Sequence, residues 1–455
     1  MNGNERERTG MHGKGVTRMV HDIMEHSIKL YSQLYQEGGA RHNVPSKLLS
    51  MGDFDKWRNT KHRFSDLPPN VQGHIREQLK VPAGLNTPIP NDRLSVLDFM
   101  AANIPTVCQQ TSSYIIPSGF SFFSAEKSSE SFLRQMAVIM VPSKTIVADL
   151  MASATQKWLD GANSITIPGN PLFYPLWMLQ VWVELHLTVV PTRNSWQKSI
   201  NWLQHKELAL FQEKVNSVYH SLSTLSWSSA REGLLSALPG KTTFPKSTLA
   251  KYLSRDWLTD EHVDQMIYLV EREVKEILPH QKIHFLDTVL IRKLRQAYQL
   301  EIDAKEKYNP FDTTFLHKFG QSLSSDSQLA SIFHINGNHW IAVVINILTE
   351  EILYGDSVGS DPNLGVVNSI RWFISKHIPS LPEDSLNDAI LPCVKQDVKF
   401  DWFNCGIYSY NALLHYFLPN NPLLQHTENP IYGDLARMSI LQKLIEFHNA
   451  VSSNF

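Results

Sequence analysis

The sequence has few cysteines and no recognisable secretion signal. Only Cys108, Cys393 and Cys405 occur among its 455 residues, and the polar segment 1–18 has no apolar stretch of the kind that directs export. Three cysteines exclude a disulfide framework and a four-thiolate zinc site. No histidine pair forms the metal-binding pattern H-E-x-x-H. We therefore expect a protein of the nucleus or cytoplasm that needs no metal and no cofactor.

The chain also lacks an excess of charge and a long uninterrupted apolar run. Its 42 Lys and Arg residues against 44 Asp and Glu leave a net charge of −2, which gives no reason to expect a nucleic-acid or membrane partner. The most apolar stretch, 172–190, contains Pro175, Gln180, Glu184 and His186. A spanning helix needs about 20 mostly apolar residues. This stretch is therefore expected to be a buried core helix.

What the chain does have is enough apolar sequence, 42% of its residues, to build a large core. In the N-terminal half apolar residues recur at helical spacing over 17–36, 145–158, 172–189 and 195–225. The segment from Leu238 to Pro245 contains Gly and Pro and is the best candidate for a linker. We expect a mostly α-helical N-terminal region, 1–240, to which no function can be assigned, followed by a second domain, 245–455.

The second domain combines helices with strands. A helix is expected after Trp257, and apolar runs predict strands at 329–335, 339–348 and 351–354. The pair Asn336-Gly337 tolerates positive φ and favours a tight hairpin turn between the first two strands. Further helices are predicted over 366–377 and from Cys405 to before Pro419. This order of elements predicts an α+β domain.

Cys405 occupies the predicted start of the last of these helices. Asn404 precedes it as a candidate N-cap, and the residues that follow are apolar. A cysteine in the first turn of a helix lies at the positive end of the helix dipole, which favours the nucleophilic thiolate. The simpler interpretation is a small buried core residue, because free cysteines are often fully buried.

His339 and Asp356 give Cys405 a possible chemical context. His339 begins one predicted strand and Asp356 follows the next. If the two strands form a hairpin around Thr349-Glu350, the start of one and the end of the other lie at the same edge of the sheet. A base and the carboxylate that orients it are then neighbours, as a nucleophilic triad requires.

These residues resemble the ubiquitin-like-specific cysteine proteases that process SUMO. The order His-Trp, then a strand pair ending in Asp-Ser, then Cys-Gly at the start of a helix is similar to that family's pattern, with 17 residues from His339 to Asp356 and 49 from there to Cys405. A second motif, Asp256-Trp-Leu-Thr-Asp-Glu-His-Val263, resembles the family's opening helix. The resemblance covers roughly 245–425. It implies a papain-like cysteine protease core, in which the Cys helix packs on a central, mainly antiparallel sheet.

The resemblance also implies roles for individual residues. By carry-over, Cys405 is the nucleophile, His339 its base and Asp356 the orienting carboxylate. The two tryptophans that enclose the substrate tail correspond to Trp257 and Trp340. An acidic position that contacts the ubiquitin-like partner corresponds to Asp260. The implied reaction is cleavage of a peptide or isopeptide bond after the C-terminal Gly-Gly of a ubiquitin-like protein, most similar to SUMO.

Two positions depart from the family pattern. Asn404 precedes the cysteine where the family usually has Asp. The oxyanion-hole glutamine of the family lies about six residues before the cysteine, where this chain has Lys399, whereas Gln396 lies nine before it. Gln396 can take the role only if the segment Val398–Trp402 contains a local insertion.

Three other functions stay open at this point. If Gln396 does not reach the site, the domain is a catalytically weak or inactive relative whose function is to bind a ubiquitin-like partner. A Cys-His-Asp acyltransferase of the same lineage would need a positively charged pocket for acetyl-CoA. A serine hydrolase would use Ser357, which lies in a G-x-S-x-G pattern that follows a predicted strand.

Overall fold

The computed structural model describes residues 57–110, 113–228, 245–312, 314–425 and 430–452. The chain forms two compact units, residues 1–74 and 75–455. The helix predicted at 17–36, and all but the last residue of the segment Leu238–Pro245, lie outside the described residues. The division into regions 1–240 and 245–455 stays a prediction.

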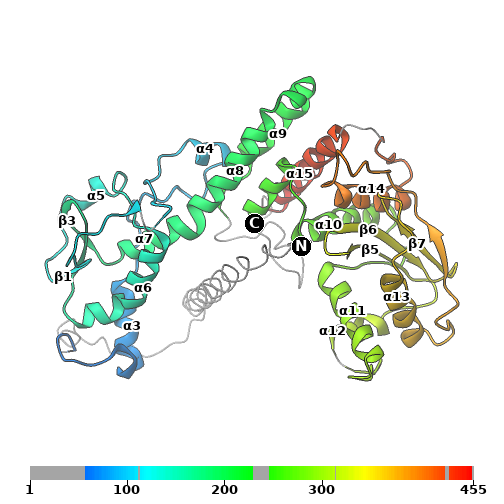
Figure 1. Cartoon of the computed structure of the whole chain (residues 1–455), viewed down its shortest axis with the longest axis horizontal. Coiled ribbons are helices and arrows are strands. Elements are labelled where there is room, and N and C mark those ends of the chain that lie inside the picture. The colour runs from blue at the N-terminus through cyan, green and yellow to red at the C-terminus, as the bar shows by residue number, and fades with distance from the viewer. Residues whose placement is uncertain (1–56, 111–112, 229–244, 313, 426–429, 453–455) are drawn as a thin grey trace, which may run out of the picture. The chain divides into compact units, whose positions relative to one another are not determined.

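The described part of the N-terminal region is mostly helical, as predicted, but it also contains a small sheet (Figure 1). The helical elements are η2 (Phe64–Asp66), α3 (Pro69–Gln78), α4 (Val96–Ala101), α5 (Phe132–Gln135), α6 (Lys144–Leu159), α7 (Met178–Glu184), η4 (Leu185–Val189), α8 (Val190–Leu203), η5 (Lys206–Phe211) and α9 (Gln212–Thr224). The antiparallel sheet has the order β1 (Phe123–Ser124), β2 (Ser164–Ile167) and β3 (Asn170–Pro175). The sequence did not predict these strands.

The prediction of a single helix over 172–189 is wrong. Its first residues belong to β3, because Gly169 adopts a φ of +76° and turns the chain into a hairpin with β2. Helix α7 begins only after Pro175, and it continues through the π-helical turn η4 into α8. No helix among the described residues is long and apolar enough to cross a membrane.

The second half of the chain is built on a five-stranded sheet of order β4-β5-β6-β7-β8. The strands are β4 (Ile283–Phe285), β5 (Gln328–Ile335), β6 (His339–Asn346), β7 (Glu351–Gly355) and β8 (Asn387–Ile390). The three central strands are antiparallel, whereas β4 and β8 run parallel to their neighbours. The predicted hairpin turn is confirmed, since Asn336 and Gly337 have φ values of 52° and 75° between the paired residues Ile335 and His339.

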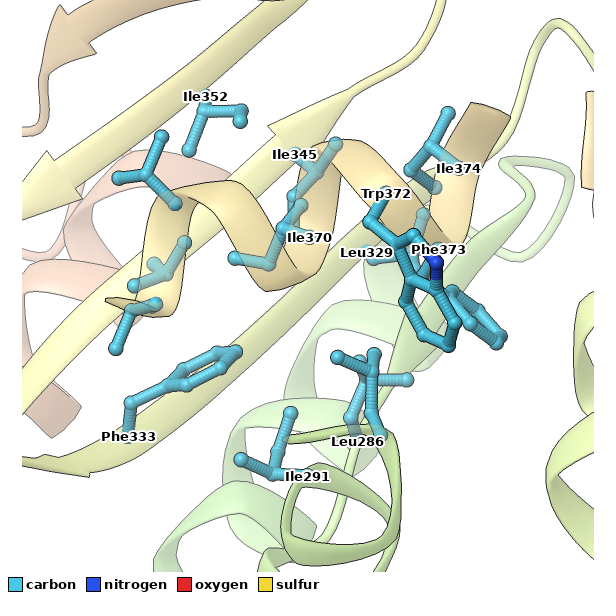
Figure 2. Packing of buried hydrophobic residues seen from close by; sticks show 14 of the residues in the cluster. Leu286, Ile291, Leu329, Phe333, Ile345, Ile352, Ile370, Trp372, Phe373 and Ile374 are labelled. Atoms are coloured by element: carbon cyan, nitrogen blue, oxygen red, sulfur yellow. The ribbon is translucent and has the colours of Figure 1, made fainter. Parts of the chain in front are cut away.

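Helices cover this sheet on both faces. The helices of this half are η6 (Lys246–Leu253), α10 (Asp260–Ile277), α11 (Thr288–Ile302), α12 (Phe315–Gln321), α13 (Leu364–His377), α14 (Cys405–Phe417) and α15 (Ile431–Ser452), of which some pack on the sheet directly and others on these helices. Helix α13 crosses one face, where Ile370 and Phe373 pack against strand residues such as Phe333 and Ile345 (Figure 2). Helix α14 packs on β5 and β6 on the other face, and α10 packs on α14. The domain is therefore α+β, with its cysteine helix on a mainly antiparallel sheet.

Burial on both faces explains the sequence of β6. A strand covered on both sides reads as a nearly continuous apolar run rather than an alternating one. Every residue of β6 from Trp340 to Ile345 is buried, with Ile341, Val343 and Ile345 in the core under α13. Helix α14 is likewise buried along its length from Cys405 to Leu414. These two elements fix the positions of His339 and Cys405 at the ends of rigid, fully packed segments.

Candidate active site

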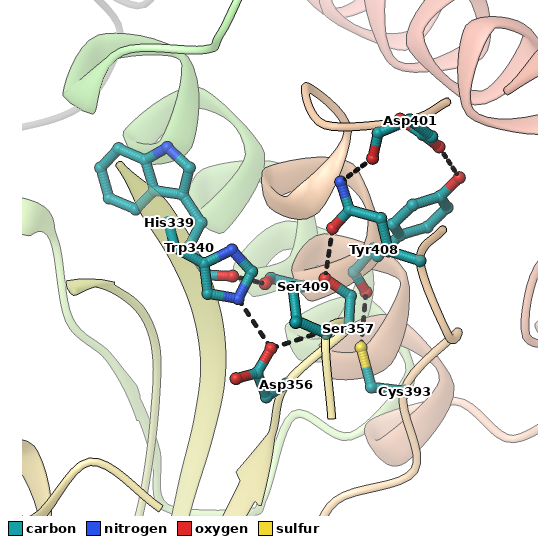
Figure 3. A network of polar contacts seen from close by, with 10 residues as sticks. His339, Trp340, Asp356, Ser357, Cys393, Asp401, Tyr408 and Ser409 are labelled. Atoms are coloured by element: carbon teal, nitrogen blue, oxygen red, sulfur yellow. Dashed lines mark hydrogen bonds and ion pairs between the residues drawn. The ribbon is translucent and has the colours of Figure 1, made fainter. Parts of the chain in front are cut away.

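His339 and Asp356 meet at the edge of the sheet, as the hairpin geometry predicted (Figure 3). His339 is the first residue of β6, and Asp356 directly follows β7, which pairs with β6. Nε2 of His339 lies 2.7 Å from Oδ1 of Asp356 and donates a hydrogen bond to it. The same oxygen accepts the backbone N–H of Val358 at 2.8 Å. The carboxylate side chain is 2% exposed and the imidazole 14% exposed.

Cys405 completes this group from the other side of His339. It is the first residue of α14 and is 4% exposed. The Cys405 side chain lies close enough to His339 to help raise the pKa of the imidazole. Because Nε2 is engaged by Asp356, the remaining ring nitrogen, Nδ1, is the one available to the thiol. The structure thus places a thiol, an imidazole and a carboxylate in sequence, with the thiol at a helix N-terminus.

The environment of this group favours a charged histidine. Burial alone would lower the pKa of His339, but the hydrogen bonds and charges of Asp356 and Cys405 outweigh it and raise the pKa from 6.5 to about 9. Burial would raise the pKa of Asp356, but the hydrogen bonds from His339 and from the Val358 N–H lower it instead. Both directions describe an imidazolium held by a carboxylate at neutral pH.

Gln396 is held close to the same edge by Ser357. Its side-chain oxygen accepts the Ser357 hydroxyl at 2.8 Å, and its backbone N–H donates to the Ser357 carbonyl at 2.6 Å. Its Nε2 donates to the main-chain oxygen of Asp401. A turn accommodates the residues between them, since the N–H of Asp401 donates to the carbonyl of Asp397 at 2.7 Å. The amide is 7% exposed, and its orientation is fixed at both ends.

Ser357 is placed for this supporting contact and not as a nucleophile. It is fully buried, and its hydroxyl donates to Gln396. The nucleophile elbow requires a strand that runs directly into a helix. Here α13 begins only at Leu364, so the G-x-S-x-G pattern has a different structure. This geometry argues against the serine hydrolase hypothesis.

Asn404 is at the N-cap position of α14, but its side chain does not cap the helix, which corrects the expectation from the sequence. Its Oδ1 instead accepts a hydrogen bond of 2.7 Å from Nε of Arg437 on α15. The oxygen bonds to the guanidinium and not to the helix N–H groups, because a buried guanidinium needs hydrogen-bond acceptors. Arg437 lies 33 residues from Asn404 in the sequence, so local patterns gave no sign of this contact.

The two tryptophans named by the resemblance have different environments. Trp257 is 41% exposed, its indole N–H donates to the carbonyl of Trp402 at 2.9 Å, and the two rings meet edge to face at 5.6 Å. Trp340 is 5% exposed and packs against His334, with ring centroids 4.5 Å apart. Trp402 is itself 52% exposed and was missed from the sequence. Its position three residues before Cys405 was the available signal.

A cavity of about 470 Å³ lies beside Trp340. Asp260 on α10 and the arginines Arg292 and Arg295 on α11 line it, together with His334. Arg292 forms an ion pair with Asp260, and Arg295 donates to the carbonyl of His334 at 2.9 Å. The cavity therefore has acidic and basic side chains in its wall, next to Trp340.

The other cysteine close to the site is unreactive by its environment. Burial, reinforced by the charge of Asp356, raises the pKa of Cys393 to about 12, so its thiol stays protonated at neutral pH. Among the described residues no group of three His, Cys, Asp or Glu side chains is arranged to bind a metal ion. The chemistry available at this edge of the sheet is that of Cys405, His339 and Asp356.

Comparison with known proteins identifies the same part of the chain. Residues 256–429 match the model of the Ulp1 protease family, C-terminal catalytic domain. Over 78 residues the chain is 31% identical to a protein of Acanthamoeba polyphaga mimivirus whose name assigns it, provisionally, to the thiol proteases. That match covers 17% of this chain and 24% of the viral protein, about a quarter of its length.

Two solved structures are among those that part of this chain resembles. The C-terminal Ulp1 protease domain in complex with Smt3, the yeast ortholog of SUMO, is 15% identical and covers 51% of this chain and 94% of its own, with a TM-score of 0.35. The Xanthomonas campestris effector XopD, bound to ubiquitin, is 13% identical and covers 41% of this chain and 91% of its own, with a TM-score of 0.25.

Proposed function

We propose, from the match of residues 256–429 to the Ulp1 protease family model, that this chain is a thiol protease that cleaves after the C-terminal Gly-Gly of a SUMO-like ubiquitin-like protein. The observation that carries the proposal is the chain of contacts from Cys405 through His339 to Asp356, with 2.7 Å between the imidazole and the carboxylate. A thiol at a helix N-terminus beside an imidazolium is the arrangement in which a cysteine acts as a nucleophile.

Each of the three residues has a distinct task in this mechanism. Cys405 attacks the carbonyl of the terminal glycine and forms a thioester as the amine leaves. His339, protonated at neutral pH, gives its proton to the leaving amine and then takes one from the water that hydrolyses the thioester. Asp356 keeps the imidazole in the tautomer and orientation that direct Nδ1 at the thiol.

Gln396 is the proposed side-chain donor to the oxyanion. One N–H of its amide is engaged by Asp401, which leaves the second N–H. The backbone N–H of Cys405, at the unpaired start of α14, is the natural second donor. The bond from Ser357 to the amide oxygen fixes which end of the amide carries the donors.

Trp257, Trp340 and Asp260 are the proposed substrate contacts. A tail that passes between flat indole rings must lack side chains, and glycine meets that requirement. Even a methyl group in a closed slot typically costs about 1–3 kcal/mol through overpacking. Trp257 is fixed by its bond to Trp402 while its ring remains 41% exposed, as a substrate contact requires. Asp260 presents a carboxylate, 45% exposed, at the start of α10.

The direct test uses ubiquitin-like proteins that carry an electrophile at their C-terminus. We expect a SUMO-like probe to form a covalent adduct with the full-length chain, and peptide mapping to place the adduct on Cys405. Cys405→Ala should abolish the adduct, while Cys393→Ala, the matched cysteine control, should react like the wild type. An adduct on Ser357, or an undiminished reaction of Cys405→Ala, contradicts the proposal.

The same assay separates the remaining alternatives. An inactive relative would bind the probe reversibly and form no adduct. An acyltransferase would transfer an acetyl group from acetyl-CoA to a protein and leave Gly-Gly conjugates intact. For this substrate we expect the protein to act in the nucleus or cytoplasm. Imaging of the tagged chain in cells tests this expectation.

A further inference from the structure

Arg437 on α15 is a buried arginine that joins two functional segments. Its Nε donates to Oδ1 of Asn404 at 2.7 Å, and its Nη2 donates to the carbonyl of Phe403 at 2.7 Å. The same guanidinium donates to the carbonyls of Ser254 at 2.8 Å and of Asp256 at 2.9 Å. The first two acceptors directly precede Cys405, and the second two lie three residues and one residue before Trp257. One side chain therefore links the nucleophile segment to the groove segment.

Gly433 makes this close approach of α15 possible. A β-carbon at this position would lie 2.3 Å from Nδ2 and 2.7 Å from Cγ of Asn404, closer than non-bonded atoms can approach. Gly433 and Arg437 are four residues apart, so they share one face of the helix. Asn404 is fully buried between them and the rest of the site. Its side chain is thus confined by a steric contact and by a charge-assisted hydrogen bond.

The charge of Arg437 is balanced inside the protein. A buried guanidinium is tolerated only when acceptors and opposite charges surround it. Asp434 and Asp401 supply negative charge, and Arg255 pairs with Asp434 at 2.8 Å. Burial lowers the pKa of Arg437 to about 10 against the opposing effect of these carboxylates, so it remains a cation at neutral pH. Its fork of donors can therefore hold several acceptors in a fixed arrangement.

We propose that α15 is part of the machinery that positions the nucleophile, with Gly433 and Arg437 acting on Cys405 through Asn404. This inference rests on the proposed role of Cys405, and it goes beyond the family match, because α15 begins at Ile431 and the match ends at 429. Asn404 is bonded to Cys405 through one peptide unit, so any displacement of Asn404 re-aims both the thiol and the Cys405 N–H. Small displacements of reacting groups lower rates strongly.

The test compares variants of the full-length chain. Gly433→Ala introduces the clash with Asn404 and leaves every charge in place, and Arg437→Lys keeps the charge but loses the fork. Lys443→Gln is the matched control, because Lys443 lies farther along α15 and pairs with Glu273 on α10 at 2.7 Å, away from Asn404. Three quantities are measured: alkylation of Cys405 by iodoacetamide, kcat and KM for a ubiquitin-like C-terminal amide, and thermal unfolding.

We expect Gly433→Ala and Arg437→Lys to lower both the alkylation rate and kcat at least about tenfold, with KM changed less than about threefold. Lys443→Gln should leave kcat and the alkylation rate unchanged even if it lowers the melting temperature. Asn404→Asp keeps an acceptor for Arg437 and should retain activity, whereas Asn404→Ala removes the acceptor and should lose it. If the α15 variants do not fold, the comparison of these two Asn404 variants tests the proposal.

Two results overturn the proposal. One is a folded Gly433→Ala whose Cys405 is alkylated at the wild-type rate. The other is equal activity of Asn404→Ala and Asn404→Asp on a substrate that the wild type cleaves. Failure of the proposed function is distinguishable, because iodoacetamide needs no ubiquitin-like substrate. A wild-type chain that cleaves no ubiquitin-like amide, while its variants still differ in alkylation, would refute the substrate and keep the positioning role.

Discussion

Replacing Asp356 with Asn should move the alkaline limit of activity to lower pH. Asp356 accepts the Nε2 hydrogen bond of His339 at 2.7 Å and is 2% exposed, so its charge acts on the imidazole with little screening. With this carboxylate and the Cys405 thiol as neighbours, the pKa of His339 is raised from 6.5 to about 9. The variant keeps the size of the side chain but removes the charge that stabilises the imidazolium.

The size of the effect follows from this shift. The difference between 6.5 and about 9 corresponds to on the order of 3 kcal/mol in favour of the protonated imidazole. Cys405 contributes a share of it, so the loss of the Asp356 charge alone should lower the pKa of His339 by about one to two units. In the proposed mechanism the amine that leaves in the first step takes a proton from His339, so activity should be lost at the pH where the imidazolium loses its proton.

The assay is kcat/KM for an amide or isopeptide substrate between about pH 6 and pH 10. The wild type should lose activity around the His339 pKa of about 9, and Asp356→Asn about one to two units lower, with a reduced plateau. Asp361→Asn is the matched control, since Asp361 is an exposed carboxylate five residues further on. Identical alkaline limits in the wild type and Asp356→Asn, or a shift in Asp361→Asn, would refute the assignment.

Other changes test the neighbouring contacts. Gln396→Ala should lower kcat about 100-fold or more with little change in KM, as loss of an oxyanion donor typically does, and Ser357→Ala should lower it less because it only frees the amide to rotate. A substrate ending in Ala-Ala should be cleaved at least about tenfold more slowly than one ending in Gly-Gly, and Trp257→Ala should cause a similar loss on Gly-Gly without unfolding the domain; equal rates for both tails would contradict the tryptophan slot. In chemical denaturation, the stability that Asp356 provides through the raised pKa of His339 should be present below about pH 6.5 and vanish as the pH rises through about 9. The free energies of unfolding of the wild type and Asp356→Asn should therefore converge at alkaline pH. A difference that does not change with pH would show that the ion pair is not the source of this stability.

The sheet edge could be predicted from the sequence because every step was local. The run from Trp340 to Ile345 is apolar without alternation, which is typical of a strand buried on both faces. Asn336-Gly337 fixed the turn before it through positive φ, and Glu350, with a φ of 56°, lies in the next turn. Two short hairpins leave no freedom in register, so the start of β6 and the end of β7 had to be neighbours.

The expectations that failed depended on partners distant in the sequence. Asn404 is a residue type that commonly caps helices, but its side-chain oxygen accepts a hydrogen bond from the guanidinium of Arg437, 33 residues away. Apolar spacing alone cannot distinguish β3 from the start of a helix, and the deciding feature was the turn at Gly169. Short apolar runs are ambiguous for this reason, and neighbouring turn residues carry more information than the run itself.

The spacing of Gln396 shows why distance along the chain is a poor measure of distance in space. Nine residues separate it from Cys405, and a rigid comparison with a spacing of six would place Lys399 at the oxyanion. The structure forms a turn from Asp397 to Asp401, so the additional residues project outward while Gln396 and Asp401 remain in contact. Loops absorb insertions at the surface with little effect on the packed residues at their ends. The position of the Gln396 amide is therefore set by the groups that hold it, Ser357 on one side and the Asp401 carbonyl on the other, and not by the number of residues between Gln396 and Cys405.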